Sequence, residues 1–368
     1  MLLLASTALA LPLLVERFDA NALPDGWKTA VATQIGGGKP SEASVADGAL
    51  VLTAGPKTKK FTAISRKFEL RDVAYLKVQA RVRTEGVDAA AANGVCGVFV
   101  RFEGGQLTQA GPCAAADWAS FTRTFVVPDG ARDVEVGFLL STAGTARFDD
   151  LLVEPVTPDW KGVNRGGFTY AWLGGDTFRE DQLVANDETF DRAVALVGAP
   201  PKERVIYRKY ANLDAIEEYT GVRAEHVATA GMIHTVVRTD AYAILEALAP
   251  VWGTPPAFLR EGLGVAFVGE WAGRDPRQAS RALAAEGEAP TLEALVDPKQ
   301  FAALPADVAY PVSGAFVQWL TATKGNDAVK ALYGSLKADS SPADNTKALE
   351  TALGMKLADA DAALRAWW

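Results

Sequence analysis

The sequence predicts a chain of two domains, an all-β sandwich followed by an α+β domain that ends in helices. Residues 16–156 consist of short apolar and β-branched runs separated by Gly, Pro and Asp, which is typical of strands joined by turns. The stretch PVTPD at 155–159 then predicts a linker. Residues 159–368 mix strand and helix patterns and finish in a series of helical segments. At 368 residues the chain is long enough to bury a sizeable core in each domain.

The strands of the sandwich are predicted from residue type and alternation. β-Branched and aromatic residues dominate each run, and turn-forming residues separate the runs at short intervals. Such spacing is typical of a β-sandwich. The predicted strands are 49–52, 63–68, 74–83, 95–102, 120–127, 133–140 and 145–153.

The second domain is predicted from its changing periodicity. Helices are expected where apolar residues recur every three or four positions, and strands where β-branched residues run together. Asp240 is expected to cap the helix that begins after it, because its side chain can accept the first free backbone N–H groups. The expected order is helix 185–197, strand 204–210, helix 212–220, strand 232–237, helix 241–249 and helix 257–267, then helices 277–286, 292–296, 312–323, 328–336, 345–353 and 357–367.

Composition and charge exclude several classes of partner. The formal net charge is −8, and no cluster of basic residues occurs along the sequence. Nucleic acids and anionic membrane surfaces require such a basic face, so neither is expected as a partner. Motifs for a nucleophile elbow, a P-loop, an EF-hand or a dinucleotide site are also missing from the sequence.

The first 15 residues predict an exported protein. Residues 1–15 are an apolar run with an A-x-A cleavage pattern, ALA at 8–10, although the basic residues that usually precede such a run are missing. The run is short for a membrane span, and no later segment is longer. We therefore expect a soluble protein in the periplasm, at the cell surface or in the medium. In that setting Cys96 and Cys113 predict one disulfide, which would contribute about 3 kcal/mol for a loop of this length.

Both ends of the N-terminal domain carry a resemblance to a known fold family. The segments ERFD at 16–19 and LPDGW at 23–27, the pair DW at 117–118, and ARFDDLLV at 146–153 are similar to galactose-binding-like jelly rolls of carbohydrate-binding modules. This resemblance implies a glycan ligand.

The resemblance also implies two kinds of site residue. Trp27 and Trp118 would stack on a sugar ring, the alternative being that they belong to the core. Glu16 and Asp150 would supply part of a structural calcium cage, since calcium takes six to eight oxygen ligands. The alternative for this acidic pair is a solvated strand end.

The centre of the second domain resembles the active-site segment of gluzincin-type zinc metallopeptidases. FLREGLGVA at 258–266 is similar to the family's W/F-L-x-E-G-L-A segment, so the resemblance implies that Glu261 stands at the third zinc-ligand position. The H-E-x-x-H motif of the family then falls on YAILE at 242–246. The later segment YPVSGAFVQWL at 310–320 is similar to the family's helix beside the cleft, which implies that Tyr310 faces the cleft.

The residues at the motif positions cannot perform zinc-dependent hydrolysis. H-E-x-x-H places two imidazoles on one helix face to hold zinc, and its Glu acts as the base on bound water. Tyr242 and Glu246 replace the imidazoles here, and Ala243 replaces the base. Zinc is therefore not expected. The sequence predicts a pseudo-metallopeptidase with a binding or scaffolding role, in which strand 232–237 pairs with an extended peptide.

Two other functions remain open from the sequence. A second alignment of the motif ends on His234, and an active metallopeptidase with a non-standard metal site would use Glu246, Glu261 and His234. The chain has only one other histidine, His226, and both are expected to be ordinary strand or loop residues. Alternatively, the protein is a secreted carbohydrate-binding protein whose second domain has no ligand of its own.

Overall fold

The computed structural model describes residues 11–33, 42–55, 60–71, 73–87, 96–105, 107–109, 116–174 and 177–368. The chain divides into two compact units. Unit 1 comprises Met1–Asp159 with Asp214–Arg223, and unit 2 comprises Trp160–Leu213 with Ala224–Trp368.

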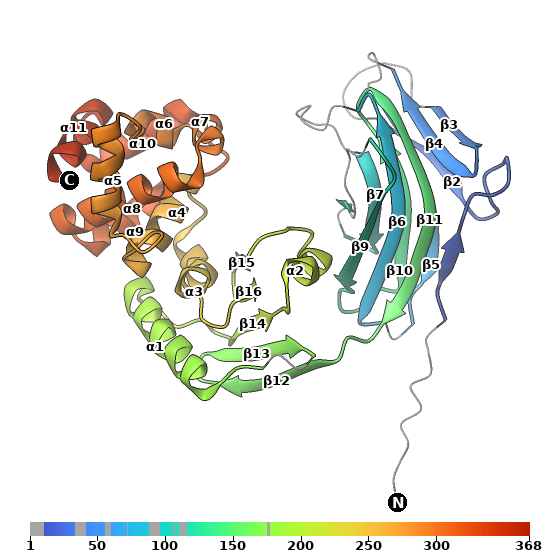
Figure 1. Cartoon of the computed structure of the whole chain (residues 1–368), viewed down its shortest axis with the longest axis horizontal. Coiled ribbons are helices and arrows are strands. Elements are labelled where there is room, and N and C mark those ends of the chain that lie inside the picture. Colours follow the sequence, from blue (N-terminus) through green and yellow to red (C-terminus); the bar gives the residue numbers. More distant parts are fainter. Residues whose placement is uncertain are drawn as a thin grey trace, which may run out of the picture. The chain divides into compact units, whose positions relative to one another are not determined.

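Unit 1 contains the predicted β-sandwich (Figure 1). One antiparallel sheet has the order β3-β4-β11-β6-β9, with β1 also paired to β11, and the other has the order β2-β5-β10-β7-β8. The strands are β1 (Leu14–Glu16), β2 (Lys28–Thr33), β3 (Glu42–Ala46), β4 (Ala49–Ala54), β5 (Lys60–Glu69), β6 (Tyr75–Glu85), β7 (Cys96–Phe102), β8 (Thr108–Gln109), β9 (Ala119–Val126), β10 (Asp133–Leu140) and β11 (Gly144–Val156). All the strands predicted for this domain are present.

Alternation along the strands separates the core from the two outer faces. On β10, Val134, Val136 and Phe138 are fully buried in the core between the sheets, while Glu135 points from the opposite face. Four short strands, β1, β2, β3 and β8, were not predicted. The sandwich begins at Leu14, a buried residue that we had expected in the leader.

Unit 2 begins with a five-stranded mixed sheet of order β12-β13-β14-β16-β15 (Figure 1). The strands are β12 (Trp160–Arg165), β13 (Phe168–Leu173), β14 (Val205–Lys209), β15 (His226–Thr229) and β16 (Met232–Thr235). β13, β14 and β16 are mutually parallel, whereas β12 and β15 pair antiparallel at the two edges. The prediction that strand 232–237 pairs with an extended peptide is wrong, because β14 and β15 already pair with the two sides of β16.

Helices make up most of the remaining chain. They are α1 (Glu180–Val197), α2 (Leu213–Thr220), α3 (Ala241–Leu248), the 3-10 turn η1 (Ala249–Trp252), α4 (Ala257–Val268), α5 (Pro276–Glu286), α6 (Leu292–Val296), α7 (Pro298–Ala303), α8 (Ala306–Lys324), α9 (Asn326–Ser335), α10 (Pro342–Leu353) and α11 (Leu357–Trp367). All but α2 belong to unit 2, and one hydrophobic core joins its helices to one face of the sheet. Only α7 among the α-helices was missed. Among the described residues, every helix is too short or too polar to cross a membrane.

Candidate functional site

The central helices α3 and α4 bring two of the predicted motif positions into contact. The Tyr242 hydroxyl on α3 donates a hydrogen bond to a carboxylate oxygen of Glu261 on α4, and it also lies 3.3 Å from the Glu261 carbonyl oxygen. Glu246 lies one turn after Tyr242 on the same helix, so both side chains leave the same face. The Glu261 residue is 7% exposed. The Tyr242 hydroxyl and the Glu261 carboxylate therefore meet beside the Glu246 carboxylate, in a mostly buried position.

Local sequence explains why α3 and α4 approach so closely. Asp240 caps α3 as predicted, its carboxylate accepting a hydrogen bond from the Ala243 backbone N–H at 2.9 Å. Gly264 on α4 leaves room for the aromatic ring, because a Cβ there would lie 2.4 Å from Cε2 of Tyr242. Gly262 does the same for α8, since its Cβ would lie 2.5 Å from the Ser313 carbonyl oxygen. The G-L-G segment is thus a packing surface.

A guanidinium supplies the positive charge between the two glutamates. Arg260 contacts the Glu261 carboxylate at 2.7 and 3.1 Å and the Glu246 carboxylate at 3.5 Å. The arginine side chain is 48% exposed, whereas those of Glu246 and Glu261 are 14% and 10% exposed. Arg260 therefore reaches in from the surface and neutralises two carboxylates that are mostly shielded from water.

The second cation of the cluster is His226, the first residue of β15. Its Nδ1 lies 3.3 Å from the Asp240 carboxylate and its Nε2 lies 3.5 Å from the Glu246 carboxylate. Burial alone would lower the pKa of His226, but the hydrogen bonds to Asp240 and Glu246 raise it to about 10. Burial alone would raise the pKa of Asp240, yet His226 and the Ala243 N–H hold it below the usual value. We did not predict His226 as a member of this site.

His234, which we considered as a metal ligand, belongs to a different environment on β16. Its Nδ1 lies 2.7 Å from the Tyr210 hydroxyl, on whose ring it stacks, and its Nε2 lies 3.0 Å from the Met232 sulfur. Burial, with a smaller contribution from the charge of Arg208, lowers the pKa of His234 to about 4. Its ring is engaged with Tyr210 and Met232, whereas His226 is the histidine that contacts Glu246.

Tyr310 on α8 lies beside the same cluster. Its ring packs on Trp271 at 4.9 Å between centroids, and burial followed by the charge of Glu261 raises the pKa of its hydroxyl. Burial and Glu261 likewise raise the pKa of Tyr242 far above its ordinary value. Both phenols therefore stay protonated and act as hydrogen-bond donors.

The chemistry available to the α3–α4 cluster follows from its charges. Three carboxylates, those of Asp240, Glu246 and Glu261, face one guanidinium and one imidazolium. Ala243, at the position of the catalytic base in the family motif, is completely buried. Among the residues that the structure describes, no three His, Cys, Asp or Glu side chains are arranged as ligands of one metal ion. The three carboxylates are therefore neutralised within the cluster by Arg260 and His226.

In unit 1, Trp27 lies in the sandwich core. The residue is 7% exposed, stacks on Phe138 at 5.5 Å, and donates its indole N–H to the Glu16 carboxylate at 3.2 Å. The core alternative that we kept open therefore describes this tryptophan, and its ring offers no face to a sugar.

Trp118 and Asp150 share a partner, Arg81 on β6 of the β3-β4-β11-β6-β9 sheet. The Arg81 guanidinium lies 4.9 Å from the Trp118 ring centroid and 3.1 Å from the Asp150 carboxylate, which Arg17 also approaches at 3.9 Å. Trp118 is partly exposed, so a role in sugar stacking stays a prediction. The Asp150 carboxylate contacts the cations of Arg81 and Arg17, and the Glu16 carboxylate accepts a hydrogen bond from Trp27. A calcium site formed by Glu16 and Asp150 likewise stays a prediction.

Only one cysteine of the predicted disulfide lies within the described residues. Cys96 begins β7 and is buried in the sandwich, whereas Cys113 lies outside the described residues. The pairing therefore remains a prediction.

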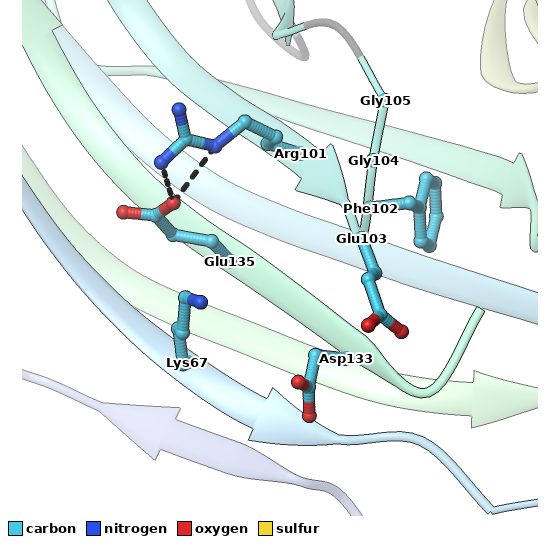
Figure 2. A pocket seen from close by; sticks show the side chains of 8 residues that line it. All are labelled: Lys67, Arg101, Phe102, Glu103, Gly104, Gly105, Asp133 and Glu135. Carbon is cyan, nitrogen blue, oxygen red and sulfur yellow. Dashed lines mark hydrogen bonds and ion pairs between the residues drawn. The ribbon is translucent and has the colours of Figure 1, made fainter.

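The outer face of the β2-β5-β10-β7-β8 sheet carries a polar hollow that sequence reasoning missed (Figure 2). Its volume is about 410 Å³, and the lining residues are Lys67, Arg101, Phe102, Glu103, Gly104, Gly105, Asp133 and Glu135. Strand register places Glu135 directly opposite Lys67 on one side and Arg101 on the other. This alternation of cations and anions across three strands has no signal in any single strand.

Glu135 is fixed in the floor of the hollow. The Ser65 hydroxyl donates to its Oε1 at 2.5 Å, and Arg101 donates to its Oε2, with the Nε contact at 2.9 Å. Burial works to raise the pKa of Glu135, but the bonds from Ser65 and Arg101 outweigh it and the pKa is lowered. The side chain is 12% exposed against 50% for Arg101. A fixed carboxylate and an accessible guanidinium thus present an acceptor and donors to a ligand.

Comparison with known proteins gives partial similarity only. No protein-family model and no curated protein matches the sequence. Solved structures similar to part of the chain include a bacteriophage CBA120 tailspike domain (12% identity, 38% of this chain and 20% of that one, TM-score 0.28). Others are the module CBM4 (23%, 38% and 97%, TM-score 0.30) and the xylan-binding domain CBM22-1 of Paenibacillus barcinonensis Xyn10C (14%, 40% and 96%, TM-score 0.28).

The match spans only a fifth of the tailspike domain, and the likeness to the two modules covers 38% and 40% of this chain. No comparison supports the gluzincin resemblance of the second domain.

Proposed function

We propose that this protein binds a glycan in the polar hollow on the β2-β5-β10-β7-β8 sheet. The observation that carries the proposal is the row Lys67–Glu135–Arg101 across three adjacent strands. Sugar hydroxyls both donate and accept hydrogen bonds, so they fit a surface where charged donors and acceptors alternate at fixed spacing. A volume of about 410 Å³ is in the range of small-ligand sites.

The rigid sheet favours such a role. Because Glu135 is held from both sides by Ser65 and Arg101, its orientation is set before a ligand arrives, which lowers the entropy cost of binding. Only Phe102 is aromatic among the lining residues, and its side chain points away from Glu135 in Figure 2. The hollow would therefore recognise the hydroxyl or acidic groups of a glycan through hydrogen bonds, and not through stacking of an aromatic side chain on a sugar ring.

A glycan array with the full-length protein tests this function. The best oligosaccharide is then titrated calorimetrically against wild type, Glu135→Gln and Arg101→Gln, which we expect to weaken binding by roughly tenfold or more. Trp118→Ala is the matched variant on the other sheet and should bind normally. Loss of binding in Trp118→Ala alone would move the site to that sheet, and an array without any bound glycan would reject the proposal.

A second candidate function is carried by Arg260. We propose that unit 2 is a pseudo-metallopeptidase domain with a binding or scaffolding role and no zinc-dependent hydrolysis, in an exported protein. Support comes from the guanidinium between Glu246 and Glu261, since a fixed cation there satisfies the carboxylates that a metal would otherwise need to neutralise.

Metal analysis and a peptidase assay test the second function. We expect no stoichiometric transition metal in the purified protein and no difference in peptide hydrolysis between wild type and Glu261→Ala. One zinc per chain together with hydrolysis that Glu261→Ala abolishes would establish the active-enzyme alternative instead.

A further inference from the structure

A second hollow lies in unit 2, between α5, α8 and the end of α11. Its volume is about 580 Å³. The lining combines two cationic, two amide and two indole side chains with one carboxylate: Asp275, Arg277, Gln278, Arg281, Gln318, Trp367 and Trp368. None of these residues belongs to the α3–α4 cluster or to the polar hollow on the sandwich.

The charges of this hollow are unbalanced. Arg277 and Arg281 lie one turn apart on α5, so both guanidinium groups leave the same helix face, where like charges repel. Neither forms an ion pair with any residue that the structure describes. The one carboxylate side chain in the lining, that of Asp275, accepts hydrogen bonds from the backbone N–H groups of Arg277 and Gln278 at the start of α5.

The neighbouring Arg365 shows the contrast. It lies 5.3 Å from the Trp368 ring centroid, but Asp361 neutralises it at 2.7 Å and it also donates to two backbone carbonyls. Arg277 has a comparable aromatic partner, the Trp367 ring at 4.5 Å, without a carboxylate. The indole face therefore orients the Arg277 guanidinium while leaving its N–H donors available.

We propose that this hollow binds a small organic anion through an oxyanion group, a carboxylate or a phosphate, held by Arg277 and Arg281. Arginine presents N–H donors in a planar fork that matches both oxyanions, and two such groups on one helix face can converge on one ligand. Gln278 and Gln318 add neutral donors and acceptors for the remaining polar atoms of the ligand. The site is independent of the glycan-binding proposal.

Calorimetry on the full-length protein tests the site with phenyl phosphate, benzoate and uncharged phenol. We expect one saturable site for phenyl phosphate or benzoate, and the preferred one identifies the oxyanion. Phenol should not bind. Arg277→Gln and Arg281→Gln should each weaken binding by roughly tenfold or more, because a hydrogen bond to a charged group contributes at least that much.

The matched control is Arg192→Gln. Arg192 also lies over an aromatic ring, that of Phe267 at 5.0 Å, but it lines a different hollow. Its replacement should leave binding unchanged, and unaltered thermal unfolding of all three variants shows that each one folds. Absence of saturable binding in wild type, equal binding of phenol, or an equal loss in Arg192→Gln would overturn the proposal.

Discussion

Removing Arg260 should destabilise unit 2 through the two carboxylates it leaves behind. In the Arg260→Ala variant, Glu246 and Glu261 lose their shared cation while their side chains stay only 14% and 10% exposed. Water cannot easily replace the guanidinium, so two negative charges would face each other in a poorly solvated place.

The size of the effect follows from burial. Breaking a fully buried ion pair from one side costs about 3–5 kcal/mol, and an exposed pair contributes about 0–1 kcal/mol. Arg260 is 48% exposed and its partners are mostly buried, so an intermediate loss of about 2 kcal/mol is expected. For a unit of this size that loss corresponds to a decrease in Tm of about 4–8 °C.

Thermal unfolding of the full chain measures the loss, with Arg274→Ala as the control on an exposed turn. The control should change stability by less than about 0.5 kcal/mol. Adding Glu261→Gln to Arg260→Ala removes one of the two repelling charges, while the amide oxygen can still accept from Tyr242. The double variant should therefore be more stable than Arg260→Ala alone. An Arg260→Ala protein as stable as wild type, or a double variant that is less stable still, would refute this account of the cluster.

Three further predictions concern the histidines and the helix contact. The pKa of His226 is raised to about 10 in the folded chain, so its contribution to the free energy of unfolding is complete below about pH 6.5 and is lost as the pH rises toward 10. In His226→Gln the free energy of unfolding should therefore change less between pH 6.5 and 10, which urea unfolding at several pH values measures. The pKa of His234 is lowered to about 4, so the free energy of unfolding decreases as the pH falls from about 6.5 toward 4, and this decrease should be smaller in His234→Gln. If His226→Gln changed the acid range and His234→Gln the alkaline range, or if neither variant changed the pH dependence, both assignments would be contradicted. Gly264→Ala should cost about 1–3 kcal/mol because its Cβ would lie 2.4 Å from the Tyr242 ring, and the cost should largely disappear in a Tyr242→Leu background if that ring is the cause.

Sequence reasoning located the elements of the fold better than their pairing. The alternation in 133–136 was sufficient to predict β10, because Val134 and Val136 are buried in the core while Asp133 and Glu135 lie on the outer face. The strand at 226–229 was not predicted, because its sequence HVAT shows no alternation of apolar and polar residues. Its antiparallel pairing with β16, across the turn at 230–231, sets His226 opposite Thr235 and brings the imidazole to Asp240.

In the candidate sites too, the sequence predicts positions within one helix better than contacts between elements. The spacing between Tyr242 and Glu246 within one helix is fixed by helical geometry, so their common face was predictable. The inward reach of Arg260 was not, because a charged residue next to Glu261 in a helix more often points to solvent. Trp27 followed the average behaviour of a tryptophan in a sandwich, which is to pack in the core.

The α3–α4 cluster is best understood from what its carboxylates require. Two mostly buried glutamates on crossing helices need a positive partner, and either a metal ion or a guanidinium can meet that need. Arg260 precedes Glu261 on the same helix and reaches both carboxylates. His226 then balances the charge that Asp240 adds. The cluster thus stabilises the contact between α3 and α4 by neutralising its own charges.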